Sequence, residues 1–302
     1  MSVSGRIAEI VDVGRVANPP LIRPPDLSQA FRRRAGRFDR LAAGSAMADF
    51  LSFMAAIAAA QSAAVASLPA PAEPPIGLSH GTLPLDRRNW RPDAAWRDTL
   101  TMICDRLAVQ PLTVQTQAAL DRLARLDADA LDQLAKAVLF FEIGEAERAA
   151  ACLAFAALQV HWTRLAGLID GTGFHTFDRP GVCPVCGSPP VASLVHSKGS
   201  LAGVRFLVCA LCLTEWHLVR IRCSSCASTE GIAYFEIEGA GGLVKAETCD
   251  QCRTYLKIVF AEKDADADVF ADDLATLGLD MLVDEAGWRR STPNPFLLPG
   301  AC

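Results

Sequence analysis

The sequence predicts an all-α N-terminal domain, two small tandem β modules with four cysteines each, and a C-terminal helix. Three observations carry this prediction. Apolar residues recur with helical spacing through the first half of the chain, Cys-x-x-Cys pairs occur four times in the second half, and an acidic amphipathic segment follows them. The expected parts are an extended leader, a helical domain, a first and a second four-cysteine module, and a C-terminal helix with an apolar tail, at residues 1–26, 27–178, 179–221, 222–262 and 263–302.

The leader and the first helix follow from proline content and apolar spacing. The segment NPPLIRPPD ends at residue 26 and predicts extended, poorly ordered chain, because proline cannot donate a backbone hydrogen bond. A helix is expected to begin in the cap region of Asp26 and Ser28 and to carry Phe31, Phe38 and Leu41. We expect this helix to continue into the alanine-rich segment that follows.

The alanine-rich segment 47–68 has the length of a membrane span, which needs roughly 20 apolar residues. However, Asp49 and several serine and glutamine residues interrupt it. Its larger side chains fall at i, i+3, i+4 and i+7, at Phe50, Phe53, Met54 and Ile57. This spacing is typical of an amphipathic helix on a protein core, so we expect no membrane insertion.

Further helical periods follow the proline-rich break at 68–77 and continue to about residue 169. Cys104 and Cys152 lie inside them among apolar neighbours and are expected to be small core residues rather than ligands. We expect these helices to fold around a core of their own.

The cysteines form a duplicated pattern, because both units have the spacing C-x2-C-x22-C-x2-C at an offset of 40 residues. A shared offset at every position indicates a duplicated structural unit. Flanking residues keep the same register, since TEWHLV after the first unit aligns with TYLKIV after the second. The eight candidate metal ligands are Cys183, Cys186, Cys209 and Cys212, and then Cys223, Cys226, Cys249 and Cys252.

Four thiolates form a tetrahedral cage that suits either zinc or iron, so two metal ions per chain are expected. The repeat favours one ion within each unit. A competing arrangement joins Cys209 and Cys212 with Cys223 and Cys226 across ten residues, and the sequence leaves it open. Gly187 follows one pair, where the tight turn favours a residue that tolerates positive φ.

Composition bounds the compartment and the activity. The chain contains eleven cysteines but begins without a charged and then apolar signal segment, so we expect a cytoplasmic protein with metal-bound rather than disulfide-bonded thiols. A site with four protein thiolates has no open position for substrate, and no phosphate-binding loop or nucleophile elbow occurs. We therefore expect no enzymatic activity.

Charge argues against a nucleic-acid partner. The net charge is −5, and the modules carry nearly equal numbers of acidic and basic residues, whereas nucleic-acid binding needs a concentrated basic face. Two runs are uneven: FRRRAGRFDR at 31–40 is basic, and EKDADADVFADD at 262–273 is acidic. Such runs are usually solvated helix faces, and the alternative is a docking surface.

A partner surface is suggested where the repeats diverge. TEWHLVR differs from TYLKIVF at charged and aromatic positions, which makes Glu215, Trp216 and His217 candidates for recognition together with the acidic C-terminal helix. The alternative is that Trp216 fills the gap between the modules and His217 caps a strand.

The C-terminal segment is expected to be one amphipathic helix, and the apolar tail NPFLLPG is expected to pack back onto the body. The apolar face of the helix comprises Val269, Leu274, Leu277 and Met281.

Several stretches closely resemble the formate dehydrogenase accessory proteins of the FdhE family: CPVCGSPPVASLV, RFLVCALCLTEWHLVRIRCSSC, VKAETCDQCRTYLKIV and NPFLLPG. All eight cysteines match the family's motifs. The resemblance implies a helical domain followed by two tandem rubredoxin-like (zinc-ribbon-like) modules in a cytoplasmic factor. Such factors are needed for active respiratory formate dehydrogenase and are understood to contact its catalytic subunit before export.

What the metal does is left open by the resemblance. Iron in a rubredoxin-like site would supply electrons or redox protection during maturation, whereas zinc would make the modules recognition scaffolds. The alternative function is a zinc-ribbon scaffold that binds another protein or nucleic acid. The sequence does not indicate an oligomeric state.

Overall fold

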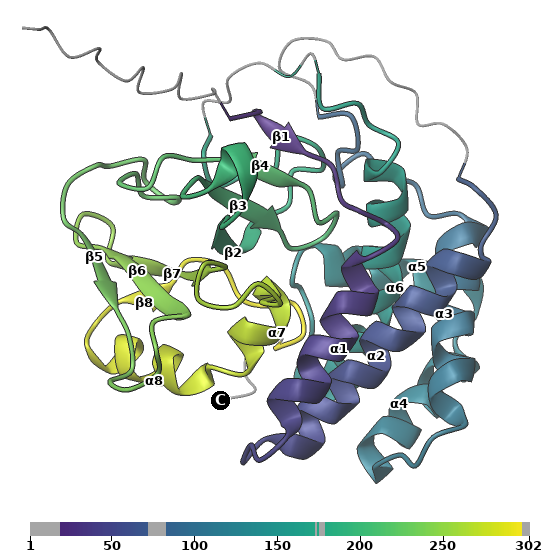
Figure 1. Cartoon of the computed structure of the whole chain (residues 1–302). Helices are drawn as coiled ribbons and strands as arrows, with labels where there is room; N and C mark the ends of the chain where they lie inside the picture. Colours follow the sequence, from purple (N-terminus) through teal and green to yellow (C-terminus); the bar gives the residue numbers. More distant parts are fainter. Residues whose placement is uncertain (1–18, 72–82, 173, 175–178, 298–302) are drawn as a thin grey trace, which may run out of the picture.

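The computed structural model describes residues 19–71, 83–172, 174 and 179–297. In the described residues, helices α1 to α6 gather on one side of the molecule, and the sheet with α7 and α8 forms the other side (Figure 1). The helices are α1 (Ala30–Ala42), α2 (Ala48–Ser67), α3 (Ala94–Ala108), α4 (Val114–Arg125), α5 (Ala128–Leu139), α6 (Arg148–Ala166), α7 (Val269–Leu274) and α8 (Leu277–Glu285), with 3-10 turns at Glu145–Glu147 and Gly199–Leu201. The strands are β1 (Ile22–Arg23), β2 (Pro190–Val195), β3 (Arg205–Cys209), β4 (Glu215–His217), β5 (Ile232–Phe235), β6 (Val244–Cys249), β7 (Thr254–Phe260) and β8 (Arg289–Arg290).

The first helix does not continue into the alanine-rich segment, so that prediction is wrong. Helix α1 ends at Ala42 and α2 begins at Ala48. Between them Gly44 has φ +76°, a left-handed backbone that a helix cannot contain but glycine adopts at low cost. The chain therefore reverses, and α1 lies beside α2 (Figure 1).

Helix α2 is the one helix of the described residues that is long and apolar enough to cross a membrane by length and composition. Here it lies in the helical core, where Leu51, Met54 and Ile57 are buried. Phe50 and Phe53, also expected on the buried stripe, are half-buried. The buried Gln61 amide donates to the carbonyl of Ala156 at 2.9 Å, which fastens α2 to α6.

The helical domain does not have a core of its own, contrary to the prediction. One continuous set of buried residues runs from α1 through α6 into the first cysteine module. The buried Gln159 on α6 joins both sides, because its amide donates to the carbonyl of Ala210 at 2.8 Å and its oxygen accepts from Arg34 at 2.8 Å. Loss of the first module would therefore expose part of the helical core.

The sheet has the order β1-β4-β3-β2-β7-β6-β5, with β8 also paired to β7. Each module contributes three antiparallel strands, β2 to β4 and then β5 to β7. The modules join where β2 pairs in parallel with β7, as Ser193 with Ile258 and Leu194 with Val259. The two repeats thus stack head to tail in one orientation, as units of a repeat array do.

Part of the expected leader is a strand. Residues 1–18 lie outside the described part of the chain, but β1 pairs with the edge strand β4, with Ile22 opposite Trp216. An edge strand offers unpaired backbone groups that proteins commonly cover. The leader therefore closes the outer edge of the first module.

The C-terminal segment forms two helices rather than the predicted one, with the break at Thr276. The buried face of α8 consists of Leu279 and Val283, whereas Met281 is 63% exposed, so its expected core position is wrong. The described part of the apolar tail, residues 294–297, packs back as predicted, because the buried Phe296 ring lies 5.5 Å from that of Phe155 on α6; the rest of the tail lies outside the described residues.

The two uneven charge runs face each other, although several of their side chains also reach solvent. Arg37 on α1 forms ion pairs with Asp272 at 2.6 Å and with Asp264 at 2.5 Å, and both Arg37 and Asp272 are buried. Weaker contacts flank them, at Arg34–Asp268 and Arg40–Asp266. The runs therefore bind the N-terminal and C-terminal parts of the chain together.

Candidate metal centres

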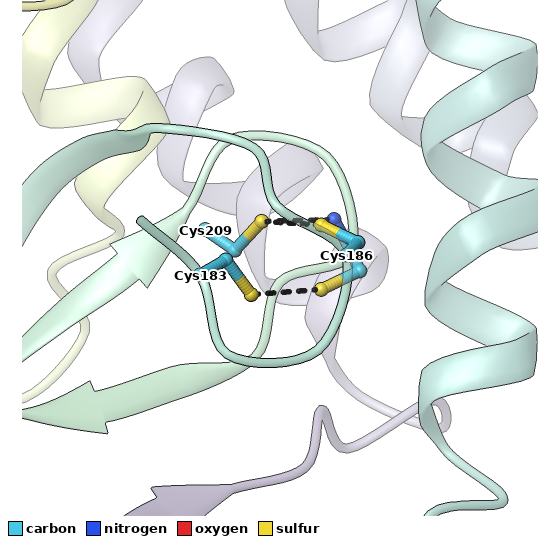
Figure 2. A group of neighbouring side chains, drawn as sticks. Cys183, Cys186 and Cys209 are labelled. Atoms are coloured by element: carbon cyan, nitrogen blue, oxygen red, sulfur yellow. Dashed lines mark hydrogen bonds between the residues drawn. The ribbon is translucent and has the colours of Figure 1, made fainter. Parts of the chain in front are cut away.

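The first four cysteines converge on one point, as the repeat predicts. Their sulfur atoms all lie within 4.8 Å of one another, with Cys183 Sγ 3.6 Å from Cys212 Sγ and Cys186 Sγ 3.4 Å from Cys209 Sγ. Figure 2 shows the sulfurs of the labelled Cys183, Cys186 and Cys209 gathered at one point. A tetrahedron of thiolates about 2.3 Å from a metal has edges of about 3.8 Å, whereas a disulfide measures about 2.05 Å. The arrangement therefore fits a metal ion and not disulfides.

The second four cysteines form an equivalent group. Cys223 Sγ lies 3.7 Å from Cys252 Sγ, and Cys226 Sγ lies 3.7 Å from Cys249 Sγ. The structure thus groups the cysteines within each unit, and the competing grouping across ten residues is absent from the described residues. We call the groups tetrad one (Cys183, Cys186, Cys209, Cys212) and tetrad two (Cys223, Cys226, Cys249, Cys252).

Every knuckle ends in a left-handed residue directly after its second cysteine. The four residues are Gly187 at φ +74°, Leu213 at +58°, Ala227 at +64° and Arg253 at +55°. The prediction for Gly187 is confirmed, but three non-glycine residues share its conformation, which costs roughly 1–2 kcal/mol for an L-residue. The conformation recurs at all four knuckles, and three of them adopt it despite this cost, which indicates that the turn is set by the need to aim both sulfurs at one point.

Hydrogen bonds to sulfur also repeat. In tetrad one the backbone N–H groups of Leu211 and Cys212 each donate to Cys209 Sγ at 3.4 Å. In tetrad two those of Ser225 and Cys226 donate to Cys223 Sγ at 3.3 and 3.5 Å. Donors of this kind stabilise thiolates and orient them toward a metal.

Two threonines belong to the centres although the sequence analysis did not single them out. Thr214 Oγ1 lies 3.2 Å from Cys212 Sγ, and Thr254 Oγ1 lies 3.1 Å from Cys252 Sγ. They are 40 residues apart, so the pattern Cys-x-Thr shared by both repeats was the signal that could have found them.

Replacing Ala227 by glycine is expected to stabilise the protein by about 0.5–1 kcal/mol. The change removes left-handed strain of roughly 1–2 kcal/mol from the folded state. Glycine also makes the unfolded chain more flexible, which lowers the stability by about 0.4–1 kcal/mol and offsets part of the gain. Thermal unfolding of the metal-loaded protein measures the difference. The matched control is Ala233→Gly in β5, which should be destabilising because its backbone has no such strain. Equal effects of the two variants would contradict the argument.

The buried thiols of tetrad one would be stabilised as thiolates by a nearby cation. Burial raises the pKa of Cys183 well above its usual value, whereas at Cys186 hydrogen bonds from the other sulfurs and Ser188 outweigh burial and lower the pKa. Burial lowers the pKa of the nearby Arg87, against the opposing attraction of the Cys186 and Cys209 thiolates. Several buried thiolates together require more positive charge than one arginine supplies, and a bound metal ion would supply it.

The three candidate recognition residues lie on β4 with different exposures. Trp216 is 4% exposed, and its indole N–H donates to the carbonyl of Pro180 at 2.8 Å, so its side chain fills space inside the protein rather than offering a surface. His217 is half-buried against the Phe206 ring, at 5.8 Å between ring centroids. Trp216 is therefore removed from the predicted surface.

Glu215 is half-buried and lines a cleft. Its carboxylate accepts from Arg23 at 2.5 Å and lies 2.7 Å from His196 Nε2. A cleft of about 460 Å³ extends from it to α1 and α7, with Lys198 and Asp268 among its lining residues. The leader, the first helix, the first module and the C-terminal helix all meet there.

The fold and the sites together define a class: a helical domain joined to a head-to-tail pair of four-cysteine modules. Comparison with known families identifies it more closely. The N-terminal, central and C-terminal domains of FdhE match residues 19–176, 182–220 and 221–297. The chain therefore belongs to the FdhE family, as its cysteine motifs suggested.

Individual members of the family are similar to this chain over nearly its whole length. The "Protein FdhE homolog" of Serratia proteamaculans is 38% identical over 288 residues, covering 94% of this chain and 92% of that protein. The homolog of Proteus mirabilis is 38% identical over 285 residues, covering 93% and 92%. The crystal structure of the FdhE protein from Pseudomonas aeruginosa matches with a TM-score of 0.81 at 34% identity, covering 93% of this chain and 100% of that one. The helical domain, the sheet with its tetrads and the C-terminal helices thus follow the fold of that structure.

Proposed function

We propose that this protein is a cytoplasmic, non-enzymatic accessory factor that binds the catalytic subunit of a respiratory formate dehydrogenase during its maturation. The observation that carries the proposal is the pair of four-cysteine centres on a helical domain in a chain of the FdhE family. Four thiolates leave no open position for substrate in either tetrad, which favours a role in recognition or redox support over catalysis.

Each tetrad would hold one metal ion through its four thiolates. Iron would supply a one-electron couple, and zinc would supply structural rigidity alone. In either case the chain's own residues position the sulfurs: the left-handed knuckle residues turn them inward, and backbone amides with Thr214 and Thr254 stabilise their charge.

Two equivalents of metal per chain are expected, because both tetrads have the geometry for one ion each. Elemental analysis of protein purified without oxygen measures the content and the identity. Iron near two equivalents supports redox assistance to the client, and zinc near two supports the scaffold role. A metal-free protein from both anaerobic and aerobic preparations would refute metal binding itself.

Client binding is expected to depend on the cleft beside Glu215. Replacing Glu215 by alanine frees Arg23 and His196 and removes the carboxylate from the cleft wall, so capture of the formate dehydrogenase catalytic subunit should fall about tenfold, the effect of losing one charged interface contact. His217→Ala tests the neighbouring position. Glu230→Ala on the exposed part of module two is the matched control and should bind normally. Unchanged capture by both β4 variants, with metal content intact, would remove this surface from the proposal.

A further inference from the structure

The repeat makes the two tetrads chemically equivalent, but the fold surrounds them differently. All four cysteines of tetrad one are 0% exposed. One cover comes from the segment before α3, where the backbone N–H of Leu85 donates to the carbonyl of Val185 at 2.9 Å and that of Arg87 donates to the carbonyl of Cys186 at 3.1 Å. The other cover is α6, whose Gln159 holds the carbonyl of Ala210. Tetrad one is therefore enclosed by the helical domain on two sides.

Tetrad two has no comparable cover among the described residues. Cys226 is exposed and Cys252 is half-exposed, while Cys223 and Cys249 face inward at 5% and 2%. Its first knuckle does meet module one, since a Cβ on Gly181 would lie 2.5 Å from the carbonyl oxygen of Ser224. The other two sulfurs, of Cys226 and Cys252, belong to residues at the surface.

The two modules can be compared position by position, because their cysteines are offset by 40 residues throughout. Cys226 is the repeat equivalent of Cys186, so the position that bonds to the Arg87 backbone in one module is the position that is exposed in the other. Tetrad one also belongs to the continuous hydrophobic core, whereas none of the tetrad two cysteines does. The same sulfur cage is thus placed once inside the protein and once at its surface.

We infer that the two centres have different tasks: tetrad one holds a locked structural metal, and tetrad two holds an exchangeable metal that solvent molecules reach through Cys226 and Cys252. The inference rests on the proposal that both tetrads bind metal. A chelator removes a metal ion from a four-thiolate site when one thiolate dissociates and the chelator reaches the vacated position on the metal. At tetrad two this approach needs no unfolding, whereas at tetrad one it requires the module to open from α6, a rare event for groups in a core.

Release of zinc from the full-length, zinc-loaded protein to the chromophoric chelator 4-(2-pyridylazo)resorcinol tests this. We expect one equivalent to leave rapidly and the second on the order of 100-fold more slowly, because the second waits for core opening. Complete unfolding in guanidinium gives the total. A total of two with a single release phase overturns the asymmetry alone, and a total below two overturns the underlying metal assignment.

Alkylation with N-ethylmaleimide assigns the phases without any substitution that endangers folding. Peptide mapping of the zinc-loaded protein should find Cys226 and Cys252 modified in step with the rapid phase, and Cys183 and Cys186 modified only with the slow phase. Mapping also separates them from the thiols outside the tetrads. Modification of Cys186 at the rate of Cys226 would overturn the inference.

Discussion

Replacing Cys183 and Cys186 by serine is expected to abolish folding of the helical domain as well as of the first module. A structural zinc site contributes on the order of 10 kcal/mol to folding, which is comparable to the whole stability of a domain, about 5–15 kcal/mol. The tetrad one cysteines lie in the same core as α6, and Gln159 of α6 hydrogen-bonds their module. The loss should appear as reduced helical circular dichroism at 222 nm and as aggregation.

The matched control is the equivalent double substitution of Cys223 and Cys226 in tetrad two. These residues lie outside the continuous core, so the helical domain should keep its circular dichroism while the second module becomes sensitive to protease. A tetrad one variant with normal thermal unfolding would show that its metal is not structural. Equal loss of helix in both variants would contradict the difference in their surroundings.

The grouping of the eight cysteines was predictable from sequence because its information is local and duplicated. Two knuckles and a fixed 40-residue offset determine which sulfurs meet, whatever surrounds them. The tail was predictable on similar grounds, since an apolar end must find a core, and Phe296 does. Periodicity also located the helices, although it missed the break that Gly44 makes between α1 and α2.

The surroundings of the sites were not predictable, because they depend on contacts between distant segments. No pattern near Cys186 or Cys226 indicates that a segment about 100 residues earlier covers only the first. Divergence between the repeats made Trp216 a candidate for a surface, but its side chain is buried and donates to the carbonyl of Pro180, a contact that no repeat pattern indicates. The two charge runs were likewise expected to be solvated helix faces, but the fold packs α1 against α7 and buries the Arg37–Asp272 pair.

Replacing Arg37 by methionine is expected to destabilise the protein by about 3–5 kcal/mol. The substitution keeps an unbranched apolar stem but leaves Asp272 buried without its cation, and breaking a buried pair from one side costs that much. Chemical denaturation of the full-length protein measures the loss. Because the pair joins the first and seventh helices, 235 residues apart in sequence, protease cleavage near α7 should also accelerate.

Arg40→Met on the same helix is the control, since Arg40 pairs with Asp266 at 3.5 Å with both side chains more than half exposed, and exposed pairs contribute at most about 1 kcal/mol. The pH dependence separates a lost charge from lost packing. Burial already raises the pKa of Asp272, and removing Arg37 takes away the main opposing effect, so the folded variant binds a proton more tightly than the unfolded chain. The free energy of unfolding of the variant must then rise as pH falls toward the raised pKa of Asp272. The difference in free energy of unfolding between the variant and the wild type must therefore become smaller. A loss that is the same at every pH would mean that Arg37 matters for its stem and not for its charge.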